Sequence, residues 1–188
     1  SRDKPKGQVN WLPMAEDTSF IVVRQTFRDR PNETAHEMSI RALDGPETPE
    51  PLSVEALATG LERSVGFING TVKTFLAWAE LFRTEQYNQL ETSDQSMFLR
   101  AGGDPMIHYL HGYWKLEADE ALVIEVTPPE CVTWNFQVDN YWMESLDYRF
   151  ARVHVNDFTA EPNEDGSVTV VVAAKDPGFG NWLNTLGH

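Results

Sequence analysis

"CVTWNFQVD", residues 131–139, alternates apolar and polar side chains more regularly than any other part of the chain. Successive side chains of a β-strand point to opposite faces of a sheet, so this alternation predicts a strand. Its apolar face consists of Val132, Trp134, Phe136 and Val138, which we expect in the core. Its polar face carries Asn135, Gln137 and Asp139, which would lie in solvent or along the floor of a binding pocket.

The segment that follows, NYWMESLDYR (140–149), mixes aromatic rings with charges and amides. It is typical either of a structural corner, in which Arg149 pairs with a carboxylate, or of a functional site. In the second interpretation Glu144 and Asp147 are the candidate catalytic acid and base. We expect Arg149 to take one carboxylate and to leave Glu144 for a ligand. The candidate ligand-binding residues are Asn135, Gln137, Asn140, Trp142, Tyr148 and Arg149.

Further strands are predicted on both sides of this region. The run YWKLEADEALVIEV (113–126) predicts two strands around the turn EADE, and SVTVVVAAKD (167–176) predicts another after an EDG turn. Near the N-terminus, residues 18–27 and 36–43 predict an antiparallel pair joined by a loop that contains Pro31 and Asn32. These runs indicate a mainly β chain with a helical insertion, an α+β protein built on an antiparallel β-sandwich.

The helical insertion is predicted over residues 53–82, with Ser53 as the N-cap. Its apolar residues recur at steps of three and four: Leu57, Leu61, Val65, Ile68, Val72, Phe75, Ala79 and Phe82. We expect this amphipathic face to pack across one side of the sandwich. Three glycines predict two helices, or a kink or close contact within one: Gly60, Gly66 and Gly70.

Composition excludes several classes of partner. Fifteen basic and 29 acidic residues give a formal charge of −14 at pH 7, which repels nucleic acids and anionic membrane surfaces. No apolar run is long enough for a membrane span, and no signal peptide is recognised, so a cytoplasmic location is favoured. Both ends look like cut edges, which suggests a fragment of a longer chain. The single cysteine, Cys131, is expected to be a buried, unreactive thiol.

Signals for metals and cofactors are weak. His108 and His111 are three residues apart but lack a clear third ligand, so we expect no metal and interpret both as hydrogen-bonded histidines. His154 alternates with apolar residues, as in a sheet. No phosphate loop, dinucleotide motif or serine-hydrolase elbow is present, and no cofactor is expected.

The order of motifs from about residue 114 to 188 resembles DUF1214, a bacterial domain family of unknown function often found with DUF1254. The motifs are the PP pair at 128–129, WNFQ, NYWMESLDY, the DGS turn, and the DPG and NWL ending. The resemblance implies a jelly-roll-like β-sandwich and supplies no catalytic residues. We expect a single domain that spans residues 1–188. Residues 1–100 would form a hairpin and helical region, and residues 101–188 would contain the sandwich motifs.

Three functional classes remain open. A module that binds a carbohydrate or another small polar molecule is favoured by the aromatics interleaved with amides. A hydrolase or isomerase acting through Glu144 and Asp147 is the second class. The third is a structural or assembly module, because a jelly roll also suits homo-oligomer formation. Fold class cannot choose between them.

Overall fold

The computed structural model describes residues 3–7, 9–18, 20–41 and 48–188. It divides into two compact units, Ser1–Ser39 and Ile40–His188. In the described part of the chain, no helix is both long and apolar enough to cross a membrane.

The strand pair predicted for the first unit is not formed among its described residues. Apolar side chains of the first run stay in solvent, with Phe20 74% and Val23 60% exposed. A turn does connect the two runs, since Asp29 O accepts from the backbone of Asn32 and Glu33 at 2.9 and 3.0 Å. The predicted runs extend over residues 19, 42 and 43, which lie outside the described residues. The prediction was wrong because β-rich composition does not by itself provide a neighbour for the backbone.

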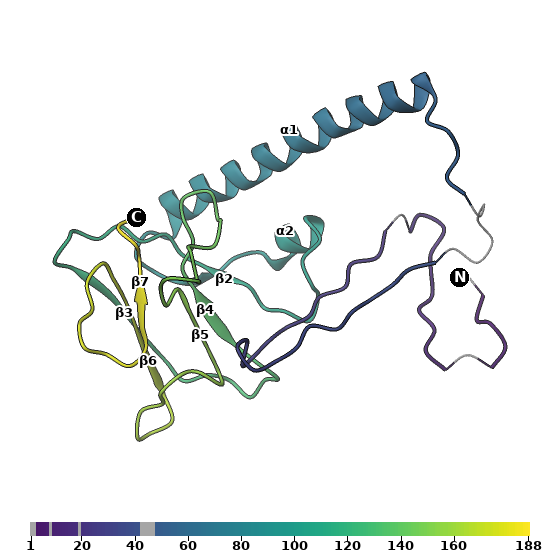
Figure 1. The fold of residues 1–188 in the computed structure, drawn as a ribbon. Coiled ribbons are helices and arrows are strands. Elements are labelled where there is room, and N and C mark those ends of the chain that lie inside the picture. Colours follow the sequence, from purple (N-terminus) through teal and green to yellow (C-terminus); the bar gives the residue numbers. More distant parts are fainter. Residues whose placement is uncertain (1–2, 8, 19, 42–47) are drawn as a thin grey trace. The chain divides into compact units, whose positions relative to one another are not determined.

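The second unit begins with a long helix, α1, which spans Val54–Glu85 (Figure 1). Ser53 caps it as predicted, and its Oγ accepts from the Ala56 backbone at 3.0 Å. The helix continues unbroken through Gly60, Gly66 and Gly70. A β-carbon built on any of these glycines meets open space, so no close contact requires them.

Packing of α1 is confined to its C-terminal end. Ala79 and Phe82 are its buried residues, each 4% exposed, whereas Leu61 and Ile68 are 60% and 59% exposed. The expected packing of the whole helix across a sandwich was therefore wrong. The amphipathic pattern identified the apolar face correctly but could not tell how much of that face has a neighbour.

Short strands and one further helix make up the rest of the second unit. They are β1 (Glu91–Thr92), α2 (Gln95–Arg100), β2 (Leu110–His111), β3 (Ala121–Val126), β4 (Asn135–Gln137), β5 (His154–Asn156), β6 (Val168–Ala173) and β7 (Trp182–Asn184). The α2 helix lies in a stretch that carried no clear pattern and is capped by Asp94, which accepts from the Ser96 backbone. His154 lies in β5, as predicted for a sheet residue.

The strands form small sheets, and their pairing is mixed. β1 pairs antiparallel with β2, and β4 with β5. β6 lies between β3, which is antiparallel to it from Ala121↔Ala173 to Val126↔Val168, and β7, which is parallel to it. The described residues thus form an α+β protein with no closed barrel, rather than a purely antiparallel one.

Only one of the two strands predicted around the EADE turn is present. β3 forms after the turn, which Glu120 N closes onto Glu117 O at 3.0 Å. Before the turn, Tyr113 makes an isolated bridge to Tyr87, and its backbone bonds with Gln86 and Asn88. These bonds tie the segment to the end of α1 instead of to a sheet.

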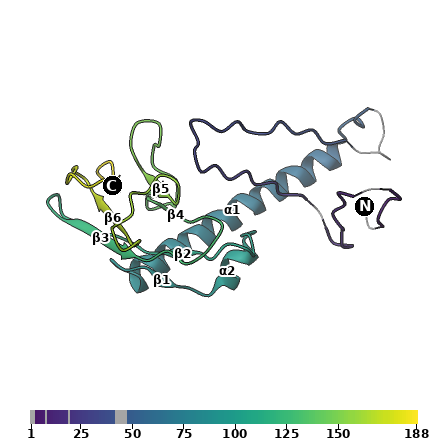
Figure 2. The ribbon, with the colours of Figure 1, turned by 90° about the horizontal axis from the view of Figure 1, so that it is seen from below.

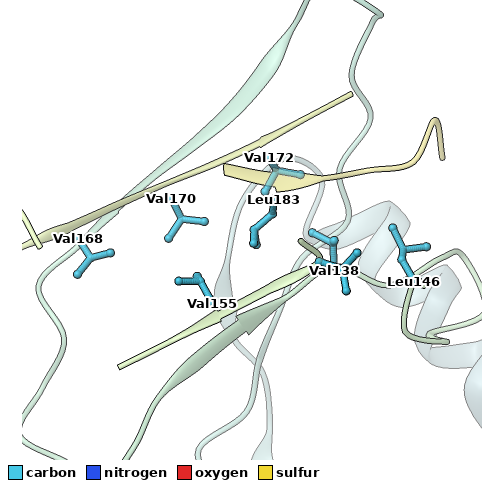
Figure 3. Packing of buried hydrophobic residues seen from close by; sticks show 8 residues of the cluster. Val138, Leu146, Val155, Val168, Val170, Val172 and Leu183 are labelled. Carbon is cyan, nitrogen blue, oxygen red and sulfur yellow. The ribbon is translucent and has the colours of Figure 1, made fainter. Parts of the chain in front are cut away.

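The main core lies where β5, β6 and β7 meet (Figure 3). Val153, Val155 and Val170 are 0% exposed and Leu183 is 1% exposed. Val138 and Leu146 join the same cluster from either side of the 139–145 segment. Trp134 and Phe136 are partly buried against it, edge to face with ring centroids 6.0 Å apart.

Two predictions around β4 were wrong. Val132 is 92% exposed and Cys131 is exposed, although both were expected to be buried. The physical reason is that the strand covers only Asn135–Gln137, so the alternation of residues 131–139 extends beyond the paired backbone. Phe136 and Val138 keep the predicted inward face, and Val132 does not.

The core assignment predicts unequal costs for two truncations. Leu183→Ala should lower the free energy of unfolding by about 2–5 kcal/mol, because it leaves a cavity among packed valines. Val132→Ala, a truncation of a side chain already in water, should change it by less than about 0.5 kcal/mol. Urea unfolding followed by tryptophan fluorescence measures both. Similar costs for the two variants would contradict the assignment of the core.

Candidate functional site

A tight turn over residues 140–144 forms the first part of the candidate site. Asn140 Oδ1 accepts from the backbone N–H groups of Trp142 and Glu144 at 2.9 and 3.1 Å. The Asn140 backbone N–H donates to Glu144 O at 2.9 Å, and its side-chain amide donates to Glu144 Oε2 at 2.8 Å. Met143 has a φ of 60°, in the left-handed region that residues other than glycine seldom adopt. One carboxylate oxygen of Glu144 is therefore bonded within the turn, and the expectation that Glu144 meets a ligand stays a prediction.

The second part is an ion pair on the next loop. Arg149 Nε and Nη2 donate to the two carboxylate oxygens of Asp147 at 2.9 and 2.7 Å, which confirms the predicted contact of Arg149 with a carboxylate. The hydrogen bonds from Arg149 hold the pKa of Asp147 below its usual value, and Asp147 raises the pKa of Arg149 in return. Both side chains are exposed, at 68% for Arg149 and 36% for Asp147, so the pair contributes little to stability.

A depression open to solvent lies along this loop and is lined by Ser145, Leu146, Asp147, Tyr148 and Arg149. Leu146, 5% exposed, fixes its floor to the main core. Three large rings of this loop and of the preceding turn remain in water: Trp142 is 58%, Tyr148 65% and Phe150 82% exposed. The Arg149 guanidinium lies over the Phe150 ring, 5.3 Å from its centroid. The loop thus presents rings and a planar charged pair together.

Other predicted site residues lie elsewhere. Asn135 and Gln137 are exposed on β4, and Gln137 Nε2 donates to Asp139 Oδ1 at 2.7 Å. Neither lines the depression. The structure therefore gathers Asp147, Tyr148 and Arg149 at one place, with the 140–144 turn preceding them along the chain.

A second polar cluster, at the end of α1, was missed by the sequence analysis. Glu80 accepts from Arg83 Nη2 at 2.7 Å and from the Tyr141 hydroxyl at 2.5 Å. The hydrogen bond from Arg83, and to a smaller degree the one from Tyr141, lowers the pKa of Glu80. The same bond to Glu80 raises the pKa of Tyr141. The spacing of Glu80 and Arg83 is a helix-surface signal, but nothing in the sequence connects them to Tyr141, 61 positions away. This bond links α1 to the residue just before Trp142.

β2, which lies against the C-terminal end of α1 (Figure 2), carries His111. Its ring stacks on Phe82 and on Phe98, with centroids 4.8 Å away in each case. In the described part of the chain, His111 Nδ1 and Gln86 Oε1 are buried without a hydrogen-bond partner. The prediction of a hydrogen-bonded His111 was wrong for this nitrogen, because aromatic neighbours surround the ring.

The structure does not bring His108 and His111 into a ligand set. His108 is exposed, and no group of three or more His, Cys, Asp or Glu side chains in the described ranges could hold a metal ion. The two histidines lie three residues apart in the sequence, but the intervening backbone is not helical, so they share no helix face.

Comparison with known proteins adds a structural relative of unknown role. No family model matches the chain, and no curated protein matches it. The chain is similar to the crystal structure of an uncharacterized protein from Burkholderia cenocepacia, with 50% sequence identity and a TM-score of 0.83. The match covers 87% of this chain and 46% of that protein, so the chain spans just under half the length of its relative.

The surroundings of His111 predict a pH-dependent stability. Burial lowers the pKa of His111, and the nearby Asp139 carboxylate opposes this shift only in part. The unfolded chain then takes up a proton at about pH 6.5 that the folded chain still excludes. The stability that comes from neutral His111 is present above that pH and is lost as the pH falls toward the lower folded pKa. Urea unfolding at steps between pH 7.5 and 5.5 measures the slope.

A phenylalanine at this position separates the effect of the proton from that of stacking. His111→Phe keeps a ring between Phe82 and Phe98 and should flatten the slope over this pH range. His108→Phe changes an exposed side chain and should leave the slope as it is. An unchanged slope in His111→Phe would show that other groups carry the pH dependence.

Proposed function

We propose that this chain is a non-catalytic module that binds a carbohydrate or another small polar molecule through the corner formed by residues 140–150. One observation carries the proposal: Tyr148 and Phe150 stand exposed next to the Asp147–Arg149 pair, and Trp142 is exposed in the turn that precedes them. Sugars offer an apolar C–H face and a set of hydroxyl groups. Exposed rings suit the first, and a guanidinium beside a carboxylate suits the second.

Preorganisation of the corner supports binding. Asn140 fixes the backbone of the turn through several hydrogen bonds, and Leu146 anchors the following residues in the core. The Tyr141 hydroxyl adds a tie to Glu80 on α1. Because these contacts fix the backbone before a ligand arrives, little of the binding energy goes into ordering it.

The catalytic alternative through Glu144 and Asp147 has weaker support. Glu144 accepts from Asn140 within the turn, and Asp147 is paired with Arg149. A general acid needs a raised pKa, whereas Arg149 lowers the pKa of Asp147 and favours its charged form at neutral pH. Asp147 therefore lacks the environment that the acid of a glycoside-cleaving pair requires.

For the fold we propose a jelly-roll-like sandwich of the DUF1214 kind, in line with the order of motifs between residues 114 and 188. Its support is the shared core, in which buried valines of β5 and β6 belong to one cluster although the two strands belong to different sheets. A β-sandwich buries the facing sides of its two sheets in this way.

Binding is tested by titrating the chain with a panel of mono- and oligosaccharides and polar metabolites, followed by NMR chemical-shift changes and calorimetry. Trp142→Ala and Tyr148→Ala should each weaken any binding by roughly tenfold or more, because the ring supplies the stacking surface. Phe179→Ala is the matched control, since that ring is 55% exposed but lies outside residues 140–150. It should leave the affinity unchanged.

The charged pair is tested by Asp147→Asn, which keeps the shape of the side chain and removes its charge. We expect weaker binding with retained folding, because the pair is exposed. Shift changes that fall outside residues 140–150, or equal losses in Phe179→Ala and Trp142→Ala, would overturn the assignment of this corner.

A further inference from the structure

The second unit contains an apolar cluster that is separate from the main core. Rings from the last turns of α1 meet rings from α2 and from the segment that includes β2. We call these six residues the aromatic cluster: Phe75, Trp78, Phe82, Phe98, Tyr109 and His111. Within the described part of the chain, the main core takes none of its residues from 54–113. The two clusters are therefore built from different stretches of the sequence.

His111 lies at the centre of the aromatic cluster. Its ring centroid is 4.8 Å from those of Phe82 and Phe98, and 6.4 Å from that of Tyr109. Both phenyl rings belong to residues that are almost fully buried. Among the described residues, His111 Nδ1 finds no hydrogen-bond partner in this position. A charged imidazole would lose more hydration here than a neutral one, so the closed cluster favours the neutral ring.

The charged groups that face His111 come from two neighbouring elements. β1 places the exposed Glu91 opposite His111 in the strand register, and the charge of Asp139 acts on the ring from the loop after β4. Both carboxylates favour a charged imidazole, but burial is the larger influence and lowers the pKa of His111. α1 and α2 face the ring with uncharged phenyl groups, and their charged residues bond elsewhere: Glu80 with Arg83, and Asp94 and Arg100 with Ser96.

The aromatic cluster has a clear boundary with the main core. Tyr113 bonds back to Gln86 at the end of α1, whereas the next residue, Trp114, packs against the main core. The Tyr141 hydroxyl reaches across the boundary to the partly exposed carboxylate of Glu80. The sheet of β3, β6 and β7 begins only at residue 121 and takes no strand from the cluster. The cluster can therefore open as a unit while this sheet stays paired.

We propose that the aromatic cluster is a pH-sensitive unit, in which protonation of His111 favours an open form that releases the end of α1 while the main core stays folded. Above about pH 6.5 the ring is neutral in both forms, and the cluster stays closed. Below that pH the open form binds a proton that the closed form excludes. From pH 7.5 to 5.5 the open population should rise by up to about tenfold. Opening also breaks the Tyr141–Glu80 bond, so the 140–150 corner loses its tie to α1 in mild acid.

Native-state hydrogen exchange of the 1–188 chain, followed by NMR in low urea at pH 7.5 and 5.5, tests the proposal. Rates are corrected for the intrinsic effect of pH on exchange. The amides of Tyr109 and Tyr113 report on the cluster, and that of Val171 in β6 reports on the sheet. We expect lower protection and a smaller urea dependence for the two tyrosines than for Val171, because less surface is exposed when the cluster opens alone. Their protection should fall by up to about tenfold at pH 5.5.

Variants identify the titrating group. His111→Phe and His111→Leu cannot bind the proton, so the protection of Tyr109 should be equal at the two pH values. His108→Phe changes an exposed side chain and should keep the fall. Equal urea dependence for Tyr109 and Val171 in the parent overturns the proposal, whether or not the variants fold, because the cluster would then open only with the sheet. A fall below about twofold in the parent, or one that persists in a His111 variant, overturns it as well.

Discussion

β6 pairs on both edges, and most of the second unit depends on this strand. β3 runs antiparallel along one edge and β7 parallel along the other, so the backbone of β6 is satisfied from both sides. Val168, Val170 and Val172 alternate inward and meet Val155 from a different sheet. Loss of this strand would remove the pairing partner of β3 and β7 together with three of the eight buried residues of the main core.

The candidate site depends on the same core, because core residues flank its turn in the sequence. Val138 enters the core just before the 140–144 turn, and Leu146 enters it just after. The polar and aromatic side chains between and beyond them are held outward by these two anchors and by the hydrogen bonds of Asn140. The fixed backbone of the corner therefore sets the direction in which the exposed rings point.

Sequence alone predicted the elements whose signals are local. The Ser53 cap and the three-to-four spacing define α1, and the valine run defines β6. The Asp147–Arg149 pair was also predictable, because its members lie two residues apart. The exposure of Val132 was not predictable, because alternation gives the face on which a side chain lies but not the length of the paired strand. The Tyr141–Glu80 bond joins two distant segments, and only the folded chain brings them together.

The valines and leucines of α1 show a further limit. Periodicity predicted an apolar face over residues 57–82. That face exists, but only its last turn is buried within the second unit. Periodicity shows which face of a helix is apolar. It does not show which neighbouring surface covers that face.

A helix anchored at one end has a graded rigidity along its length. Near Ala79 and Phe82, opening a backbone hydrogen bond requires aromatic packing to be broken, whereas near Val54 it requires little more than the loss of the Ser53 cap. The three interior glycines lower the barrier further, because they favour non-helical states. In an isolated chain, amide protons of α1 would therefore exchange with deuterated solvent in order, from the N-terminal turns inward, without unfolding of the sheets.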